Sequence, residues 1–137
     1  MYKIVIIDDE PIIVEGLART MPWNEWECLV AGTAYDGVEG QRLIRNVKPN
    51  LVITDISMPG MNGLNMIARL KAEFPDMEIS ILTGFREFEY AQKAIKLGVT
   101  RLILKPSTIS EIEEAVTTMV SNLKNKNIRT ESEETES

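Results

Sequence analysis

Short apolar runs rich in isoleucine, valine and leucine recur along the chain, and the first, over residues 2–7, fits a strand buried on both faces. Most are shorter than an ordinary helix, and polar or turn-forming residues bound them. The pattern predicts strands over residues 2–7, 28–33, 51–54, 78–83 and 102–104.

Amphipathic segments with apolar residues at helical spacing lie between these runs. Pro11 suits a first helical turn, Asp36 can cap the N-terminus of a helix, and Gly98 can end one. The apolar pattern stops at Asn125, after which polar and acidic residues dominate. The spacing predicts helices over residues 11–21, 37–47, 64–74, 87–97 and 108–124.

Strands that alternate with helices call for a parallel sheet covered by helices on both faces, so the expected fold class is α/β. We expect one domain over residues 1–124, because the chain's 137 residues leave no room for a second of ordinary size. Residues 125–137 are interpreted as a polar acidic linker or tail, and we expect them to be disordered.

Composition excludes several classes of function. The chain has one cysteine, which rules out an internal disulfide, and no histidine, which rules out His-ligated metals, histidine-based catalysis and a phosphohistidine of its own. Its net charge of −6 argues against direct binding of nucleic acid. Without a leader pattern or a membrane-length apolar run, we expect a soluble cytoplasmic protein with no membrane contact.

The candidate chemistry lies beyond the carboxyl ends of the predicted strands, where open α/β sheets bind their ligands. Clustered carboxylates repel one another unless a cation joins them, and an all-oxygen ligand set favours Mg²⁺. A carboxylate beside Mg²⁺ and a lysine can attack a phosphoryl group and form an aspartyl phosphate. The residues at these strand ends are Asp8, Asp9, Asp55, Thr83 and Lys105.

Taken in order, these motifs resemble the receiver domain of two-component response regulators over residues 2–124. The resemblance implies a flavodoxin-like (βα)5 fold, a doubly wound parallel five-stranded sheet with strand order 2-1-3-4-5. It also implies a cis peptide before the proline of the last motif. The motifs that carry it are Ile7-Asp8-Asp9-Glu10, residues 55–63, Thr83-Gly84 and Lys105-Pro106.

The resemblance also implies a role for each site residue. Asp55 would accept the phosphoryl group from a partner histidine kinase, in a reaction that requires Mg²⁺. Thr83 would swing toward the phosphoryl group, and Lys105 would pair with it. The metal would bind directly to Asp9, Asp55 and the main-chain carbonyl of Ser57, and through water to Asp8.

Phosphorylation would then switch the face formed by helix four, strand five and helix five (residues 87–97, 102–104 and 112–120), through which a homodimer is plausible. Residues 84–98 further resemble YesN-like receivers joined to AraC-type effectors. We therefore expect a signalling module, not an enzyme, that controls transcription within a longer regulator. It would reach DNA only through an effector domain outside this chain; a stand-alone receiver that acts through protein contacts is the alternative.

Two other classes fit less well. A Mg²⁺-dependent aspartyl-phosphate phosphohydrolase of the haloacid-dehalogenase type has a second aspartate two residues after the nucleophile, where this chain has Ser57. A flavodoxin-like cofactor-binding module needs a phosphate-cradling loop after the first strand, where Asp8-Asp9-Glu10 would repel a phosphate.

The sequence departs from many receivers at two positions. Leu102 stands where many have an aromatic residue that couples the lysine to the threonine shift. Phe85 flanks the route of the water that would hydrolyse the aspartyl phosphate, and its apolar ring offers no group to orient that water. We therefore predict slow self-dephosphorylation.

Overall fold

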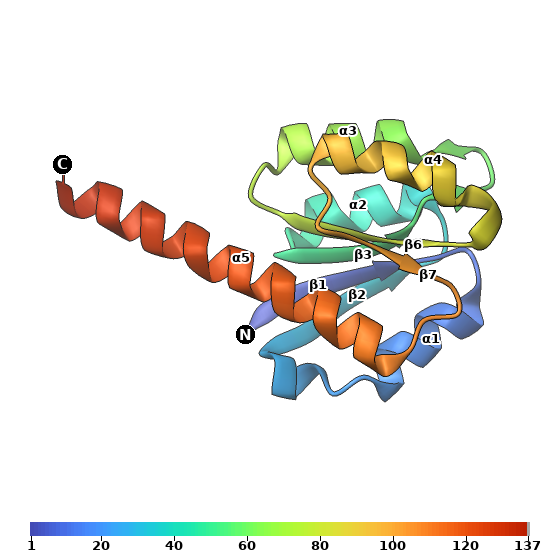
Figure 1. Ribbon diagram of the computed structural model, residues 1–137, viewed down its shortest axis with the longest axis horizontal. Coiled ribbons are helices and arrows are strands. Elements are labelled where there is room, and N and C mark those ends of the chain that lie inside the picture. Colours follow the sequence, from blue (N-terminus) through green and yellow to red (C-terminus); the bar gives the residue numbers. More distant parts are fainter. Residues whose placement is uncertain (137) are drawn as a thin grey trace.

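The fold is a five-stranded parallel sheet with helices on both faces (Figure 1). The computed structural model describes the backbone of residues 1–136 and the side chains of residues 1–127. The strand order β2-β1-β3-β6-β7 confirms the predicted order 2-1-3-4-5, because β4 and β5 form a separate small hairpin. The sheet strands are β1 (Tyr2–Ile7), β2 (Cys28–Ala34), β3 (Leu51–Asp55), β6 (Glu78–Thr83) and β7 (Arg101–Leu104).

Helices α1 and α5 cover one face of the sheet, and α2, α3 and α4 cover the other (Figure 1). Asp36 caps α2 as predicted, since its side chain accepts a hydrogen bond from the backbone N–H of Glu39. The helices are α1 (Pro11–Thr20), α2 (Gly37–Val47), α3 (Gly63–Glu73), α4 (Phe88–Gln92) and α5 (Ile109–Glu136).

Strand β1 shows how the apolar runs build the two cores. Its side chains alternate between faces, so Ile4 and Ile6 pack under α1 and α5 while Val5 and Ile7 pack under α2 and α3. All four are fully buried. Burial of each such side chain contributes about 1.5–3 kcal/mol to folding. A strand buried on both faces reads as the continuous apolar run seen in the sequence.

The predicted helix over residues 87–97 is divided into three short pieces. Two 3₁₀ helices, η2 (Phe85–Glu87) and η3 (Lys93–Leu97), flank the five-residue α4. The buried residues Ala91 and Ala94 are three positions apart, which matches the three-residue turn of a 3₁₀ helix. Gly98 ends the segment with φ 91°, as predicted.

Helix α5 continues to Glu136, so the prediction that it ends at Lys124 was wrong. The expected disorder of residues 125–137 stays a prediction. No glycine or proline interrupts this stretch, and the backbone can keep its hydrogen bonds beyond Leu123, the last buried apolar residue among the side chains that the structure describes. In Figure 1 the helix projects past the sheet. The division into a domain over 1–124 and a tail over 125–137 stays a prediction, and residue 137 lies outside the described residues.

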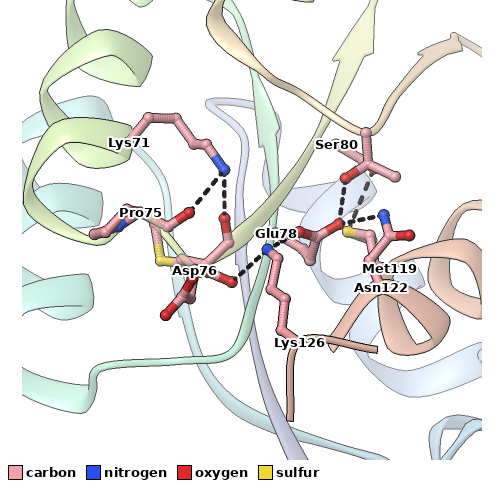
Figure 2. Close-up of polar contacts among 10 residues, drawn as sticks. Lys71, Pro75, Asp76, Glu78, Ser80, Met119, Asn122 and Lys126 are labelled. Carbon is pink, nitrogen blue, oxygen red and sulfur yellow. Dashed lines mark hydrogen bonds and ion pairs between the residues drawn. The ribbon is translucent and has the colours of Figure 1, made fainter. Parts of the chain in front are cut away.

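Two polar contacts hold the far part of α5 against the sheet. Glu78, buried at the start of β6, accepts hydrogen bonds from Asn122 at 2.7 Å and from Lys126 at 2.5 Å (Figure 2). Thr100 donates a third, at 2.8 Å. Lys124 forms an exposed ion pair with Glu27 at 2.7 Å. The helix is thus fixed at the edge of the sheet opposite to the carboxyl ends of the strands.

The segment predicted as a loop after β3 contains a small hairpin of two-residue strands, β4 (Ser57–Met58) and β5 (Met61–Asn62). Gly60 allows the turn between them, with φ 71°. The Lys105–Pro106 peptide bond is cis, as the resemblance implied. Among residues 1–136, no helix combines the length and the apolar character needed to cross a membrane.

Candidate functional site

Three aspartates meet where β1 and β3 end. The two strands pair in parallel with Ile7 opposite Thr54, which brings the residues that follow, Asp8 and Asp55, to the same level. One carboxylate oxygen from each of Asp8, Asp9 and Asp55 lies within 4.8 Å of the others. Asp8 is fully buried, Asp55 nearly so, and Asp9 is half-buried.

Lys105 reaches this cluster from the end of β7. Its Nζ lies 2.7 Å from Asp8 Oδ2 and 3.1 Å from Asp55 Oδ2. Its backbone N–H donates to the Thr83 carbonyl at 2.8 Å, which fixes the root of the side chain beside β6. One ammonium group therefore faces two buried carboxylates, and the three carboxylates and this lysine together carry a net charge of −2 when all are ionised.

Backbone N–H groups hold the other oxygen of each buried carboxylate. Glu10 donates to Asp8 Oδ1 at 2.9 Å, and Ser57 donates to Asp55 Oδ1 at 3.1 Å. Sequence reasoning missed these two donors. The signal that could have found them is an aspartate followed two residues later by a free N–H, the arrangement of an Asx-turn.

The pKa values reflect this crowding. Burial, with the repulsion from Asp8, raises the pKa of Asp55 to about 6, against the pull of the Ser57 N–H and of Lys105. Burial likewise raises the pKa of Asp8, although Lys105 opposes it. For Lys105, burial alone would lower the pKa, but the two carboxylates outweigh it and the pKa is raised. Lys105 therefore stays protonated, and it is the ionised form of the two buried carboxylates that is disfavoured.

Thr83 and Ser57 lie at the same edge of the sheet but differ in what they contact. Thr83 is buried at the end of β6, and its hydroxyl donates to the Gly84 carbonyl at 3.0 Å. Ser57 is exposed and touches Asp55 through its backbone N–H. The structure therefore brings Asp8, Asp9, Asp55 and Lys105 into one cluster, with Thr83 beside it and its single hydroxyl proton engaged elsewhere.

Buried carboxylates at the carboxyl ends of a doubly wound sheet, paired with a lysine, define a receiver-type site. The response regulator receiver domain family model matches residues 4–117, and the chain belongs to this family.

Individual relatives point the same way. The chain is 38% identical over 128 residues to the transcriptional regulatory protein YesN of Bacillus subtilis. The aligned region covers 93% of this chain and 35% of YesN. It is 41% identical over 126 residues to the transcriptional regulatory protein HptR of Staphylococcus aureus, covering 90% of this chain and 48% of HptR. The chain thus spans less than half the length of these relatives.

A solved structure shows the same fold. The REC domain of AraT, a response regulator from Geobacillus stearothermophilus, superposes with a TM-score of 0.87 at 34% identity. The match covers 92% of this chain and 98% of the AraT domain. The chain is thus a receiver domain of a two-component response regulator, a signalling module whose curated relatives are transcriptional regulators.

Proposed function

We propose that this receiver accepts a phosphoryl group from a partner histidine kinase onto Asp55, in a reaction that requires Mg²⁺. The observation that carries the proposal is the contact of Asp55 Oδ2 with Lys105 at 3.1 Å, beside two further aspartates within 4.8 Å. The lone pair of Asp55 would form the new O–P bond as the P–N bond of the partner's phosphohistidine breaks and the imidazole leaves.

Each residue has a distinct task. With a pKa of about 6, Asp55 is mostly ionised at neutral pH and can act as the nucleophile. Lys105 places a positive charge where the phosphoryl oxygens would arrive, and the Thr83 hydroxyl would turn from Gly84 to donate to one of them. The Ser57 N–H keeps the attacking carboxylate oriented.

The acidic cluster fits a hard divalent cation, since its donors are oxygens and the single charge of Lys105 offsets one of three carboxylates. Asp9, Asp55 and the Ser57 carbonyl would hold Mg²⁺, with Asp8 acting through water. When bound, Mg²⁺ would neutralise charge on the phosphoryl oxygens.

The switched surface is proposed to be the α4–β7–α5 face. It exposes three large apolar side chains, Ile95, Leu104 and Ile109, which are 57%, 41% and 55% accessible. Phosphorylation would take the charge at Asp55 from −1 to about −2 and change how these elements pack, and a homodimer through this face would cover the apolar residues.

The downstream role is proposed to be transcription control through an AraC-type effector outside this chain, because the relatives YesN and HptR are transcriptional regulators. In that arrangement, DNA contacts belong to the effector. A stand-alone receiver that signals through protein contacts is the second candidate. Whether the natural reading frame continues past Ser137 distinguishes the two.

The test is labelling of Asp55 by a small phosphodonor such as acetyl phosphate. In the presence of Mg²⁺, intact-mass spectrometry should show one added phosphoryl group on the wild type and on Asp76→Asn, which removes an exposed carboxylate at the opposite edge of the sheet. Asp55→Asn should gain none, and chelation of Mg²⁺ should abolish labelling. Equal labelling of wild type and Asp55→Asn would overturn the proposal.

A further inference from the structure

Tyr90 connects α4 to the segment that follows the phosphoacceptor. Its hydroxyl donates a hydrogen bond to Asn62 Oδ1 at 2.9 Å and accepts one from the Leu64 N–H at 3.4 Å. The same Asn62 oxygen accepts from the Asn65 N–H at 3.1 Å and so caps α3. One side-chain oxygen therefore joins the β4–β5 hairpin, the start of α3 and the side of α4.

This contact completes a chain of interactions from Asp55 to α4. The Asp55 carboxylate accepts from the Ser57 N–H, and Ser57 pairs with Asn62 across the β4–β5 hairpin. Asn62 in turn accepts from Tyr90. Each step is a direct contact between neighbours, and the first begins at the atom group that would carry the phosphoryl group.

The segment at the far end of this chain is weakly held by its own backbone. Helix α4 has five residues between two 3₁₀ turns, so contacts with neighbouring elements, and not its own backbone hydrogen bonds alone, position it. Tyr90 and Leu102 pack against the same core cluster. Leu102 stands where many receivers have the aromatic residue that links the site to this face, which leaves that role open.

We propose that the Tyr90–Asn62 hydrogen bond stabilises α4 in its unphosphorylated arrangement and breaks when Asp55 is phosphorylated. The structure has the features of the unphosphorylated arrangement, because the Thr83 hydroxyl donates to Gly84. A phosphoryl group on Asp55 would add negative oxygens beside the Ser57 N–H, shift the hairpin and pull Asn62 from Tyr90. By linkage, weakening this bond must favour phosphorylation by the same factor. This inference rests on the proposed function.

The first test needs no phosphodonor. Tyr90→Phe removes the hydroxyl and keeps the ring, so hydrogen exchange of the α4 and η3 amides should speed up about two- to tenfold, the range for one lost neutral hydrogen bond. Tyr2→Phe, which removes a hydroxyl at the opposite edge of the sheet, should leave these amides unchanged. Unaltered exchange in Tyr90→Phe would overturn the link.

A double-mutant cycle identifies the partner. Asn62→Ser keeps a side chain that can cap α3 but is too short to reach Tyr90. It should reproduce the faster α4 exchange, and adding Tyr90→Phe to it should have a clearly smaller effect than in the wild type, because only the long 3.4 Å bond from the Leu64 N–H is then left to lose. Additive effects would show that Tyr90 acts through another contact and would contradict the proposal.

The second test measures the consequence. With Mg²⁺ present, Tyr90→Phe should bind beryllofluoride, an analogue of the phosphoryl group, about two- to tenfold more tightly than the wild type. Equal or weaker binding would overturn the regulatory role while leaving the proposed function intact. A wild type that binds no beryllofluoride would instead overturn the proposed function and this inference with it.

Discussion

Lys105 holds together two buried carboxylates that would otherwise repel each other. Its ammonium contacts both Asp8 and Asp55, yet burial and mutual repulsion still raise the pKa of Asp55 to about 6. The residues proposed to carry out phosphoryl transfer therefore destabilise the metal-free domain. Such opposition between stability and function is common where charges are gathered at a site.

Asp55→Asn should make the metal-free domain more stable at pH 7. The substitution removes a carboxylate that must ionise in a buried place, a penalty of at most about 3 kcal/mol for a pKa raised from 3.8 to about 6. Urea unfolding in the presence of a chelator measures the gain. Asp76→Asn is the control, and its exposed carboxylate should change the free energy of unfolding little. A less stable Asp55→Asn would show that the carboxylate is stabilising.

Phe85 should set a long phosphoryl lifetime. Its ring is 84% exposed and lies two residues after Thr83, where it offers no group that can hold or activate a water molecule. Phe85→Glu should shorten the lifetime of the aspartyl phosphate several-fold, because a carboxylate can orient the water or accept its proton. Decay of the phosphorylated mass after removal of phosphodonor measures this, with Phe85→Leu as the apolar control. Equal lifetimes in the wild type, Phe85→Glu and Phe85→Leu would show that residue 85 does not control hydrolysis of the aspartyl phosphate.

At the scale of elements, α5 is fixed by contacts distant in sequence. Glu78 precedes its partners Asn122 and Lys126 by 44 and 48 residues, and all three meet at the start of β6 (Figure 2). Burial alone would raise the pKa of Glu78, but the hydrogen bonds from Lys126, Asn122 and Thr100 outweigh it and lower the pKa. The Glu78 carboxylate is therefore ionised, and its hydrogen bonds hold α5 against the start of β6.

Lys126→Met should loosen the far part of α5. The substitution leaves a buried carboxylate without its ammonium, a loss of about 1–3 kcal/mol in the free energy of unfolding. Lys124→Met is the matched control on the same helix, since its ion pair with Glu27 is exposed to solvent and should contribute little to stability. Amide exchange over residues 120–127 and urea unfolding measure both. Equal effects of the two substitutions would contradict a special role for Glu78.

The sequence was sufficient to predict elements whose local pattern and final packing agree. The strand runs around Ile4 and Ile53, the Asp36 cap and the Gly98 terminus were all confirmed, as each follows from burial or backbone conformation at one place. The meeting of Asp8 with Asp55 followed from strand order once the family resemblance supplied that order. Strand periodicity alone leaves the order open.

What the sequence did not predict depends on partners far along the chain. The apolar stripe of α5 ends at Leu123, so pattern reading stopped the helix at Lys124, whereas the Glu78 anchor and an uninterrupted backbone carry it on. The sequence pattern predicts a strand that begins at Glu78 and gives this residue no role. An acidic residue at the start of a buried strand nevertheless indicates that polar partners lie nearby. The Tyr90–Asn62 contact likewise joins residues 28 positions apart.

At the scale of the whole molecule, the pKa values of two groups of carboxyls are shifted in opposite directions. Asp8 and Asp55 have raised pKa values, so their favourable contribution is complete below pH 3.8 and is lost as pH rises through the folded pKa, about 6 for Asp55. Glu78 has a lowered pKa, so its contribution is present above pH 4.5 and is lost as pH falls through its folded value. The metal-free domain should therefore be most stable in mild acid and weaker at neutral pH.

Mg²⁺ should reverse the weakening at neutral pH. At a concentration about a hundred times its dissociation constant, a ligand that binds only the folded state adds about 2.7 kcal/mol to the free energy of unfolding. The gain should appear at pH 7 and shrink at pH 5, because protonation of Asp55 with its pKa of about 6 removes a ligand. Urea unfolding across this range, with Mg²⁺ or with a chelator, measures it. Asp9→Asn should lose most of the gain and Lys124→Met should keep it, whereas a gain independent of pH and retained in Asp9→Asn would place the cation elsewhere.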